Sequence, residues 1–289
     1  MEAFKADLRN ILPTQLYISE RKYQTCSALF EKNGFDDYPP IPVRRIGNDL
    51  FFTDGHTRAL LLWQNGIRDA TVYYDTDEMD WIMYLVDLEW CRDRGIRTIA
   101  GLKDRIVDAR SYQEKWIDRC SESHDLLAED PIRDLKVEFE TDDERKSAIC
   151  AEVLGSLPQW FGIGSAVLEY VEKVRELAFV TVQLYGKTIG FCAVKINYGI
   201  NADLYVLGVF EEFHRKGIGA RMVDFVQSYC RKNKIRYMSV KTLSERHPDE
   251  NYSNTRKFYK RCGFIPFEEL PTLWGEDNPC LVMIKPTSA

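Results

Sequence analysis

The hydrophobic pattern of residues 203–232 changes once, from the period of a strand to the period of a helix. Residues 203–208 have the two-residue period of a strand. This period predicts Leu204, Val206 and Gly208 on one face and Asp203, Tyr205 and Leu207 on the other. From residue 218 the apolar residues recur along one helical face: Ile218, Met222, Phe225, Val226 and Tyr229. Gly217-Ile218-Gly219 lies between the two elements. A strand that runs through a glycine turn into a helix presents free backbone N–H groups, which suit a phosphate or pyrophosphate.

The same two periods order the rest of the second half. They predict strands and helices in the order β-α-α-β-β-β-α-β-α-β-β over residues 135–286. The expected strands are 135–139, 178–185, 188–195, 203–208, 237–241, 264 onward and 280–285, and the expected helices are 142–154, 165–177, 218–232 and 252–262.

The first half predicts a separate module. Residues 4–12 are expected to form a short helix that ends at Pro13, and residues 43–52 a β-hairpin about Gly47-Asn48-Asp49. A strand at 15–18 is predicted before the hairpin. After the hairpin we expect a helix from residue 53 to Asn65-Gly66, a strand at 70–74 and helices within 77–120. Residues 121–133 are polar without a clear period. The predicted domains are therefore 1–125 and 135–289, with a linker at 126–134.

Composition narrows the class of protein. A chain of 289 residues is long enough for two domains, and a net charge of −6 argues against a general nucleic-acid surface. No apolar run reaches the length of a membrane span, and the first residues lack a secretory signal, which predicts a cytoplasmic protein. The eight cysteines include no Cys-x-x-Cys pair and the four histidines are far apart, so we expect reduced thiols and no metal site.

Two motifs in the second half resemble the GNAT acyltransferase superfamily. His214, Gly217 and Gly219 follow the pattern Gln/Arg-x-x-Gly-x-Gly/Ala after a strand, although His214 departs from the commonest first residue. Asn254, Tyr259 and Gly263-Phe264 match the second motif. The resemblance implies that acetyl-CoA binds with its pyrophosphate on the amides of the glycine turn. The implied cofactor-binding residues are Val209, His214, Arg215, Lys216, Gly217, Ile218, Gly219, Ala220 and Asn254.

The resemblance also implies roles in transfer of the acetyl group to an amine. Asp203 matches the position where some members place a carboxylate base; the alternatives are a solvated carboxylate at the strand end and a base that acts through water. Tyr259 is expected as the general acid for the thiolate, and the Val209 N–H as the donor to the thioester carbonyl. The acceptor is an unidentified small-molecule or peptide amine, and the sequence leaves a homodimer open.

Residues 13–75 resemble the ParB/sulfiredoxin-like superfamily. The matching features are Pro42-Val43-Arg44 before the hairpin, Asp54-Gly55-His56-x-Arg58 at the start of a helix, and Gly66 at its end. The resemblance implies that this loop binds nucleotide phosphates. Its predicted contacts are Asp54, Gly55, His56, Thr57 and Arg58. Locally, Asp54 is as well explained as a helix cap, Gly55 as a turn and Arg58 as the partner of a carboxylate.

The fold class that follows is α/β (α+β) with two domains. The first is a ParB/sulfiredoxin-like fold with added helices, and the second is a GNAT fold with a mixed, mostly antiparallel sheet. The expected enzyme is an acyl-CoA-dependent N-acyltransferase. For the first domain two alternatives stay open: a nucleotide-dependent kinase for a small molecule such as a free amino acid, or a regulatory module that senses a nucleotide.

Overall fold

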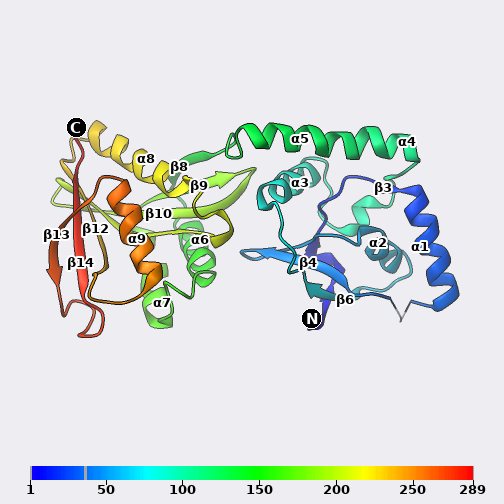
Figure 1. The fold of residues 1–289 in the computed structure, drawn as a ribbon, viewed down its shortest axis with the longest axis horizontal. Helices are drawn as coiled ribbons and strands as arrows, with labels where there is room; N and C mark the ends of the chain where they lie inside the picture. The colour runs from blue at the N-terminus through cyan, green and yellow to red at the C-terminus, as the bar shows by residue number, and fades with distance from the viewer. Residues whose placement is uncertain (1, 36–37, 289) are drawn as a thin grey trace. The chain divides into compact units, whose positions relative to one another are not determined.

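A computed structural model describes residues 2–35 and 38–288. The chain divides into two compact units, residues 1–133 and residues 134–289, and Figure 1 colours both from the N-terminus to the C-terminus. Among the residues described, no helix combines the length and apolar character that crossing a membrane requires.

The first unit is built on a five-stranded sheet. Its strands in spatial order are β1 (Ala3–Asp7), β6 (Asp69–Tyr74), β4 (Ile41–Ile46), β5 (Asp49–Phe52) and β2 (Ile11–Leu12). The predicted hairpin is confirmed, because β4 and β5 pair antiparallel about a turn in which Gly47 has φ +57°. The predicted helix and strand after it are confirmed as α2 (His56–Gln64) and β6.

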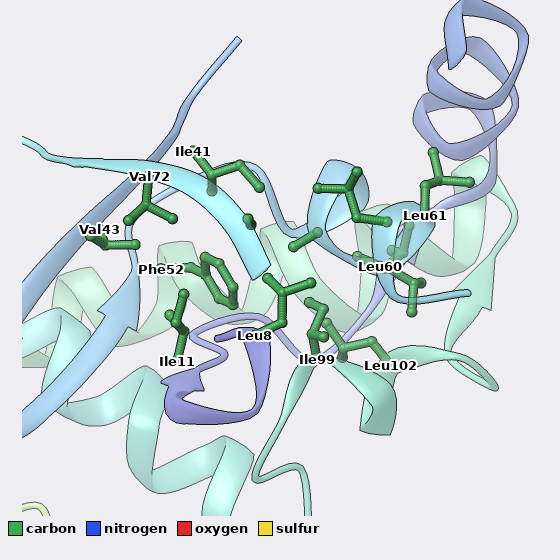
Figure 2. Packing of buried hydrophobic residues seen from close by; sticks show 14 of the residues in the cluster. Leu8, Ile11, Ile41, Val43, Phe52, Leu60, Leu61, Val72, Ile99 and Leu102 are labelled. Atoms are coloured by element: carbon green, nitrogen blue, oxygen red, sulfur yellow. The ribbon is translucent and has the colours of Figure 1, made fainter. Parts of the chain in front are cut away.

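Helices and short strands complete the first unit. They are α1 (Glu20–Asn33), α3 (Trp81–Asp93), the 3-10 turn η2 (Ile99–Leu102), β3 (Ile18–Ser19), β7 (Ile106–Val107), α4 (Ala109–Tyr112), a π-helical segment (Gln113–Ile117) and α5 (Asp118–Glu129). The core brings together side chains from the sheet, α2 and η2, including Ile11, Phe52, Leu60 and Leu102 (Figure 2).

Two local expectations in this unit were wrong, and one helix was missed. Residues 4–12 form β1, a 3-10 turn and β2 instead of a helix, because β1 finds an antiparallel partner in β6, more than sixty residues away along the chain. Helix α1 was missed, although Ser19 accepts a hydrogen bond from Lys22 N–H at its start and Gly34 has φ +82° after its end. Helix α5 continues to Glu129, into the segment expected as a linker, and buries Leu127.

The second unit is a seven-stranded sheet in the order β13-β14-β12-β11-β10-β9-β8. Only β11 and β12 pair in parallel and the other neighbours are antiparallel, so the mixed, mostly antiparallel sheet is confirmed. The strands are β8 (Lys136–Glu140), β9 (Ala178–Leu184), β10 (Lys187–Asn197), β11 (Asn201–Val209), β12 (Tyr237–Leu243), β13 (Ile265–Leu270) and β14 (Cys280–Pro286).

Helices cover both faces of this sheet. Helix α8 (Ile218–Lys232) packs Phe225 and Tyr229 on Phe139 of β8, and its first turn touches α9 (Glu250–Arg261). Helix α6 (Asp143–Gly155) packs on the opposite face, together with α7 (Gly164–Lys173). All four helices were predicted, within a few residues at their ends.

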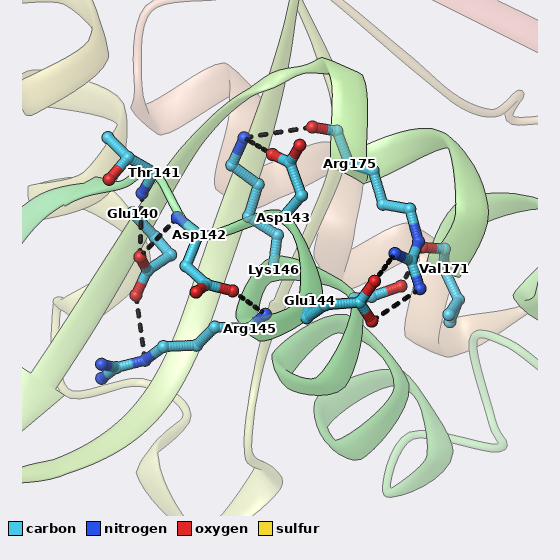
Figure 3. A network of polar contacts seen from close by, with 10 residues as sticks. Glu140, Thr141, Asp142, Asp143, Glu144, Arg145, Lys146, Val171 and Arg175 are labelled. Atoms are coloured by element: carbon cyan, nitrogen blue, oxygen red, sulfur yellow. Dashed lines mark hydrogen bonds and ion pairs between the residues drawn. The ribbon is translucent and has the colours of Figure 1, made fainter.

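A polar network fixes α6 against the segment that ends α7 (Figure 3). Lys146 Nζ donates to Asp143 Oδ1 at 2.8 Å and to the Arg175 carbonyl at 3.1 Å, while Ser147 Oγ donates to the Val171 carbonyl at 2.6 Å. Arg175 also forms an ion pair with Glu144. Exposed pairs contribute little free energy each, so the buried Lys146 and Ser147 bonds do most to hold α7 beside the central strand.

Candidate functional site

Strands β11 and β12 separate in the middle of the sheet. They pair in parallel only from Asn201–Leu204 to Tyr237–Val240. Beyond that point β11 stays with β10 and β12 stays with β14, so residues 205–209 and 241–243 have no strand between them in the described chain. We call this opening the strand fork. Its facing backbone edges keep hydrogen-bonding groups that the sheet does not use.

A β-bulge lies where the fork begins. In the ladder with β10, Val206 is opposite Ala193 and Leu204 is opposite Val194, so Tyr205 is an extra residue. The strict alternation expected for residues 203–208 was therefore wrong. Tyr205 contacts Tyr170 of α7 with ring centroids 5.4 Å apart, and Gly208 faces Val153 of α6, so both are on the α6–α7 side.

The glycine turn ends β11 and starts α8. Gly217 is the N-cap of α8 with φ +81° and no side-chain cap, and Arg215 also has a positive φ of +61°. The described residues offer no hydrogen-bond acceptor to the backbone amides of 215–220. A β-carbon on Gly217 would meet nothing within 4 Å, so glycine is required there by the backbone angle and not by crowding.

Gly219 leaves room for a neighbouring helix. A β-carbon at this position would lie 3.0 Å from Cζ of Phe258 on α9, closer than carbon atoms pack. The glycine therefore allows the first turn of α8 to lie against α9. Asn254, one turn before Phe258 on the same side of α9, is exposed beside this contact.

His214 ties the turn back to the strand. Its Nε2 donates to the Val209 carbonyl at 2.8 Å, and its ring packs edge-on against Trp160 with centroids 5.5 Å apart. The imidazole is therefore occupied by the protein's own backbone. The direct effect of His214 is to hold the conformation of the loop between β11 and α8.

The Val209 amide points into the fork. Phe210 N–H donates to the Ile189 carbonyl on β10 at 2.9 Å, so its neighbour Val209 turns both backbone groups away from β10. Leu207 lies two residues before Val209, between Val209 and the bulge, and its backbone groups have the same orientation. Leu207 was not among the predicted residues, because only the ladder reveals which amides face the fork.

Asp203 lies on the paired part of β11 and is buried. Its Oδ2 accepts from Nζ of Lys241 at 2.6 Å and its Oδ1 from Oγ of Ser239 at 3.3 Å. Val209 lies six positions farther along β11, about 20 Å away at 3.3 Å per residue. The structure thus brings Asp203 to the closed end of the fork and Val209 to its open end, and Leu207 lies between them.

Tyr259 is set by the end of α9. Phe264 N–H donates to the Tyr259 carbonyl and Gly263 N–H to the Lys260 carbonyl, both at 3.0 Å, which is a Schellman motif with Gly263 at φ +89°. The Phe264 ring then packs on the Tyr259 ring at 5.7 Å. Burial raises the pKa of the Tyr259 phenol well above its ordinary value, so the phenol is protonated at neutral pH.

One orphaned polar group borders the fork. Thr242 on β12 is 2% exposed, and its hydroxyl has no hydrogen-bond partner among the described residues. A buried hydroxyl without a partner costs free energy, and a bound polar group would restore its hydrogen bond. Thr242 was not among the predicted residues, because a threonine in a short strand carries no local signal of an unpaired hydroxyl.

The predicted phosphate loop of the first unit has a similar backbone and different side chains. Gly55 is the N-cap of α2 with φ +78° and no side-chain cap. His56 is buried, its Nε2 accepts from Thr14 N–H at 3.0 Å, and burial lowers its pKa to about 4. Arg58 donates to the Pro39 carbonyl at 2.8 Å and lies 3.7 Å from Asp54. The imidazole is thus an acceptor for the protein's own backbone. The Arg58 guanidinium is likewise partly used by protein groups, the Pro39 carbonyl and the Asp54 carboxylate.

Comparison with known proteins places the second unit. Residues 174–266 match the acetyltransferase (GNAT) domain family, and the match includes no residue of the first unit. No curated protein matches the chain.

Three solved structures illustrate the likeness, and each covers 53% of this chain. A GNAT-family protein from Desulfovibrio desulfuricans is 16% identical with 99% of its own chain covered and a TM-score of 0.46. Ard1 from Thermoplasma volcanium is 19% identical (97%, 0.42). The aminoglycoside 6'-N-acetyltransferase from Enterococcus faecium is 20% identical (98%, 0.41).

The family match runs from before β9 to the first residues of β13 and so includes both edges of the fork, the glycine turn and α9. Residues 174–266 therefore form an acetyltransferase domain of the GNAT family, which confirms the predicted enzyme class, an acyl-CoA-dependent N-acyltransferase.

Proposed function

We propose that the second unit binds acetyl-CoA along the strand fork and transfers the acetyl group to an amine. The observation that carries the proposal is the run of backbone amides at 215–220, which find no acceptor within the described protein, at the N-terminus of a fifteen-residue helix. Pyrophosphate oxygens are the acceptors that such amides and the helix dipole favour. The open space at Gly217 and the orphaned Thr242 hydroxyl agree with a ligand that runs from the turn into the fork.

The residues divide the work of binding. Arg215 and Lys216 keep the turn basic, and the amides of Gly217, Ile218, Gly219 and Ala220 hold the pyrophosphate. Asn254 contacts the pantetheine arm from α9. His214 acts through the loop, because its ring holds the Val209 carbonyl.

The amide that meets the thioester lies farther back on β11 than the turn. The thioester is at the far end of the pantetheine arm from the pyrophosphate, so a donor well back along the strand from residues 215–220 is better placed than one beside them. Leu207 N–H meets this condition and lies nearer to Asp203 than Val209 N–H does. We therefore assign the thioester carbonyl to Leu207 and the arm to Val209.

The chemistry needs a base and an acid on the two sides of the fork. Bound acetyl-CoA supplies the activated acyl group. Asp203 accepts the proton from the attacking amine, directly or through water, and Tyr259 donates a proton toward the departing sulfur. The raised pKa of Tyr259 keeps the phenol protonated, and the buried position of Asp203 excludes bulk water from the carboxylate.

The acceptor side is aromatic and has one carboxylate nearby. Tyr170 and Tyr205 pack edge to face beside the bulge, and Tyr252 donates to the Trp160 carbonyl at 2.8 Å. Burial raises the pKa of Tyr170 to about 12, and the nearby Glu169 carboxylate adds to the shift. Tyrosine faces and a carboxylate attract an ammonium ion, which supports a cationic amine as acceptor.

Calorimetry with acetyl-CoA and release of free thiol in the presence of amines test the proposal. We expect binding of acetyl-CoA to the full chain and thiol release with at least one class among monoamines, polyamines, aminoglycosides, amino acids and peptides. Absence of binding would refute the proposal, and binding without thiol release for any class would refute the assignment of an amine acceptor.

Nucleotide binding by the first unit stays a prediction. The uncapped start of α2 supports it, whereas the internal bonds of His56 and Arg58 leave fewer groups for a phosphate than the motif predicts. Calorimetry with ATP, ADP and CTP tests it, and Arg58→Ala separates binding at this loop from binding elsewhere. Consumption of ATP with a free amino acid would favour a kinase over a sensor. The ParB/sulfiredoxin-like fold and a homodimer also stay predictions.

A further inference from the structure

Lys241 stands at the point where β11 and β12 part. Val240 is the last residue of β12 in register with β11, opposite Leu204, so Lys241 is the first residue of β12 within the fork. Its ammonium lies 2.6 Å from Asp203 Oδ2. The lysine side chain is 37% exposed and the aspartate side chain 5% exposed, so a partly accessible lysine is paired with a buried carboxylate.

The pair has the chemistry that an acceptor amine and its base must have. Acetyl transfer needs a nitrogen that can lose a proton to a carboxylate and that lies beside the thioester. Asp203 is the base in the proposed reaction, and Lys241 already places an amine against it. Lys241 therefore occupies the position of an acceptor supplied by the protein itself.

We infer that Lys241 is an acetylation site of this protein, modified on Nζ by the acetyl-CoA bound to the same chain. The inference rests on the proposed function, because it needs the thioester in the fork. It goes beyond that function by naming one acceptor.

The reaction balances with groups at hand. Lys241 begins as an ammonium and gives one proton to Asp203. The neutral amine then forms a bond from Nζ to the acetyl carbon, and the carbon–sulfur bond breaks with its electron pair left on sulfur. The second proton of the amine is transferred to the sulfur, with Tyr259 as the relay, and Asp203 returns its proton to water. The products are the Nζ-acetyl amide and free CoA thiol.

Acetylation would change the site. The amide carries no charge, so Asp203 would lose its cation while staying buried. A buried carboxylate without a cation attracts another one, and the ammonium of an external acceptor would take that place. The modification would thus make Asp203 available to the acceptor.

A second lysine offers a matched comparison. Lys260, on the last turn of α9, lies 2.8 Å from Glu245 and is 47% exposed. It shares with Lys241 an ion pair with a carboxylate and a similar exposure. It differs in position, since Glu245 is 68% exposed and neither residue belongs to the fork. Reaction with acetyl-CoA from solution would label Lys260 at least as fast as Lys241.

The test is a time course of the purified full chain with acetyl-CoA, read by intact mass and by peptide mapping. We expect Lys241 to gain one acetyl group at least about tenfold faster than Lys260, since orientation favours the bound reaction. Lys241→Arg keeps a positive charge beside Asp203 and should remove only the label at residue 241. Asp203→Asn should slow the labelling of Lys241 and leave Lys260 unchanged. Equal rates at the two lysines would overturn the inference.

Two further measurements separate this inference from the proposed function. Calorimetry on the same preparation shows whether acetyl-CoA binds; binding with no preference for Lys241 overturns the inference and leaves the function, whereas no binding overturns both. The second measurement mixes Gly217→Glu chains, which keep Lys241, with Lys241→Arg chains, which keep the acetyl-CoA site. In this mixture Lys241 can be labelled only by acetyl-CoA bound to another molecule. No label at Lys241 in the mixture supports reaction within one chain, and a label at the rate of the unaltered protein overturns it.

Discussion

Gly217→Glu tests the placement of the pyrophosphate most directly. Gly217 caps α8 at φ +81°, and a β-carbon added there would meet nothing within 4 Å, so a side chain enters the space assigned to the ligand. A glutamate charge about 6 Å from one phosphate charge, at an effective dielectric constant near 20, costs about 3 kcal/mol. Affinity for acetyl-CoA should therefore fall by more than about 100-fold.

The backbone angle adds a cost that has to be separated from the charge. Any L-residue at this φ loses about 1–2 kcal/mol of folding stability relative to glycine. Gly217→Ala carries that strain without the charge, so it should lower the melting temperature and weaken binding far less. Gly199→Glu is the second control, because Gly199 has φ +67°, meets nothing within 4 Å and lies in the turn before β11, at the end of the strand away from the glycine turn.

The assay is calorimetric titration with acetyl-CoA at low and high salt, together with thermal unfolding of each variant. A charge effect should shrink as salt is raised, since screening weakens it. If Gly217→Glu binds acetyl-CoA as tightly as Gly199→Glu, the pyrophosphate does not lie on this turn, and the assignment of residues 215–220 is wrong.

Three further predictions concern single groups. Tyr259→Phe should lower kcat by about 100-fold with little change in the acetyl-CoA Kd, and an unchanged kcat would exclude the phenol as the acid. Gly190→Ala would place a β-carbon 2.6 Å from the Gly208 carbonyl oxygen, so we expect a loss of about 1–3 kcal/mol of stability and weaker acetyl-CoA binding, whereas Gly155→Ala, which meets nothing within 4 Å, should do neither. His56 has a pKa of about 4 in the folded protein and 6.5 in the unfolded chain, so as pH falls from 6.5 toward 4 only the unfolded chain gains the proton. The free energy of unfolding should therefore fall by about 1.4 kcal/mol per pH unit, about 3 kcal/mol in all. Denaturation read by hydrogen exchange of first-unit amides at pH 7 and 5 should show this slope, and His56→Gln, which keeps an acceptor, should lose it.

Local chemistry explains why much of the second unit was predictable. The turn into α8 needs glycine at a positive φ, and the end of α9 needs Gly263 for the same reason, so the spacing of glycines marks both places. The strand and helix periods between them are long enough to fix the element types. These features are set by residues within a few positions of each other, and a sequence records them directly.

Contacts between distant residues explain what was missed. The Lys241 ion pair and the orphaned Thr242 hydroxyl depend on where β12 leaves β11, and no residue type in β12 marks that point. His56 was predicted as a ligand contact from its motif, but Thr14, forty-two residues earlier, supplies the N–H that its imidazole accepts. A motif names the residue and leaves its partner undecided.

The sequence by itself determined the order of elements in the second unit and the glycine turn before α8, and its two motifs indicated an acetyltransferase. The order and the turn follow from side-chain periods and backbone angles that are set locally, and the class follows from the resemblance of the two motifs to a known family. Only the tertiary structure decided that a bulge at Tyr205 turns the central strand, that the Leu207 and Val209 amides face an open fork, and that Lys241 stands beside Asp203. Strand pairing is a long-range choice made by the ladder as a whole, so the hydrogen-bonding groups left over for a ligand appear only once every strand has found its neighbours.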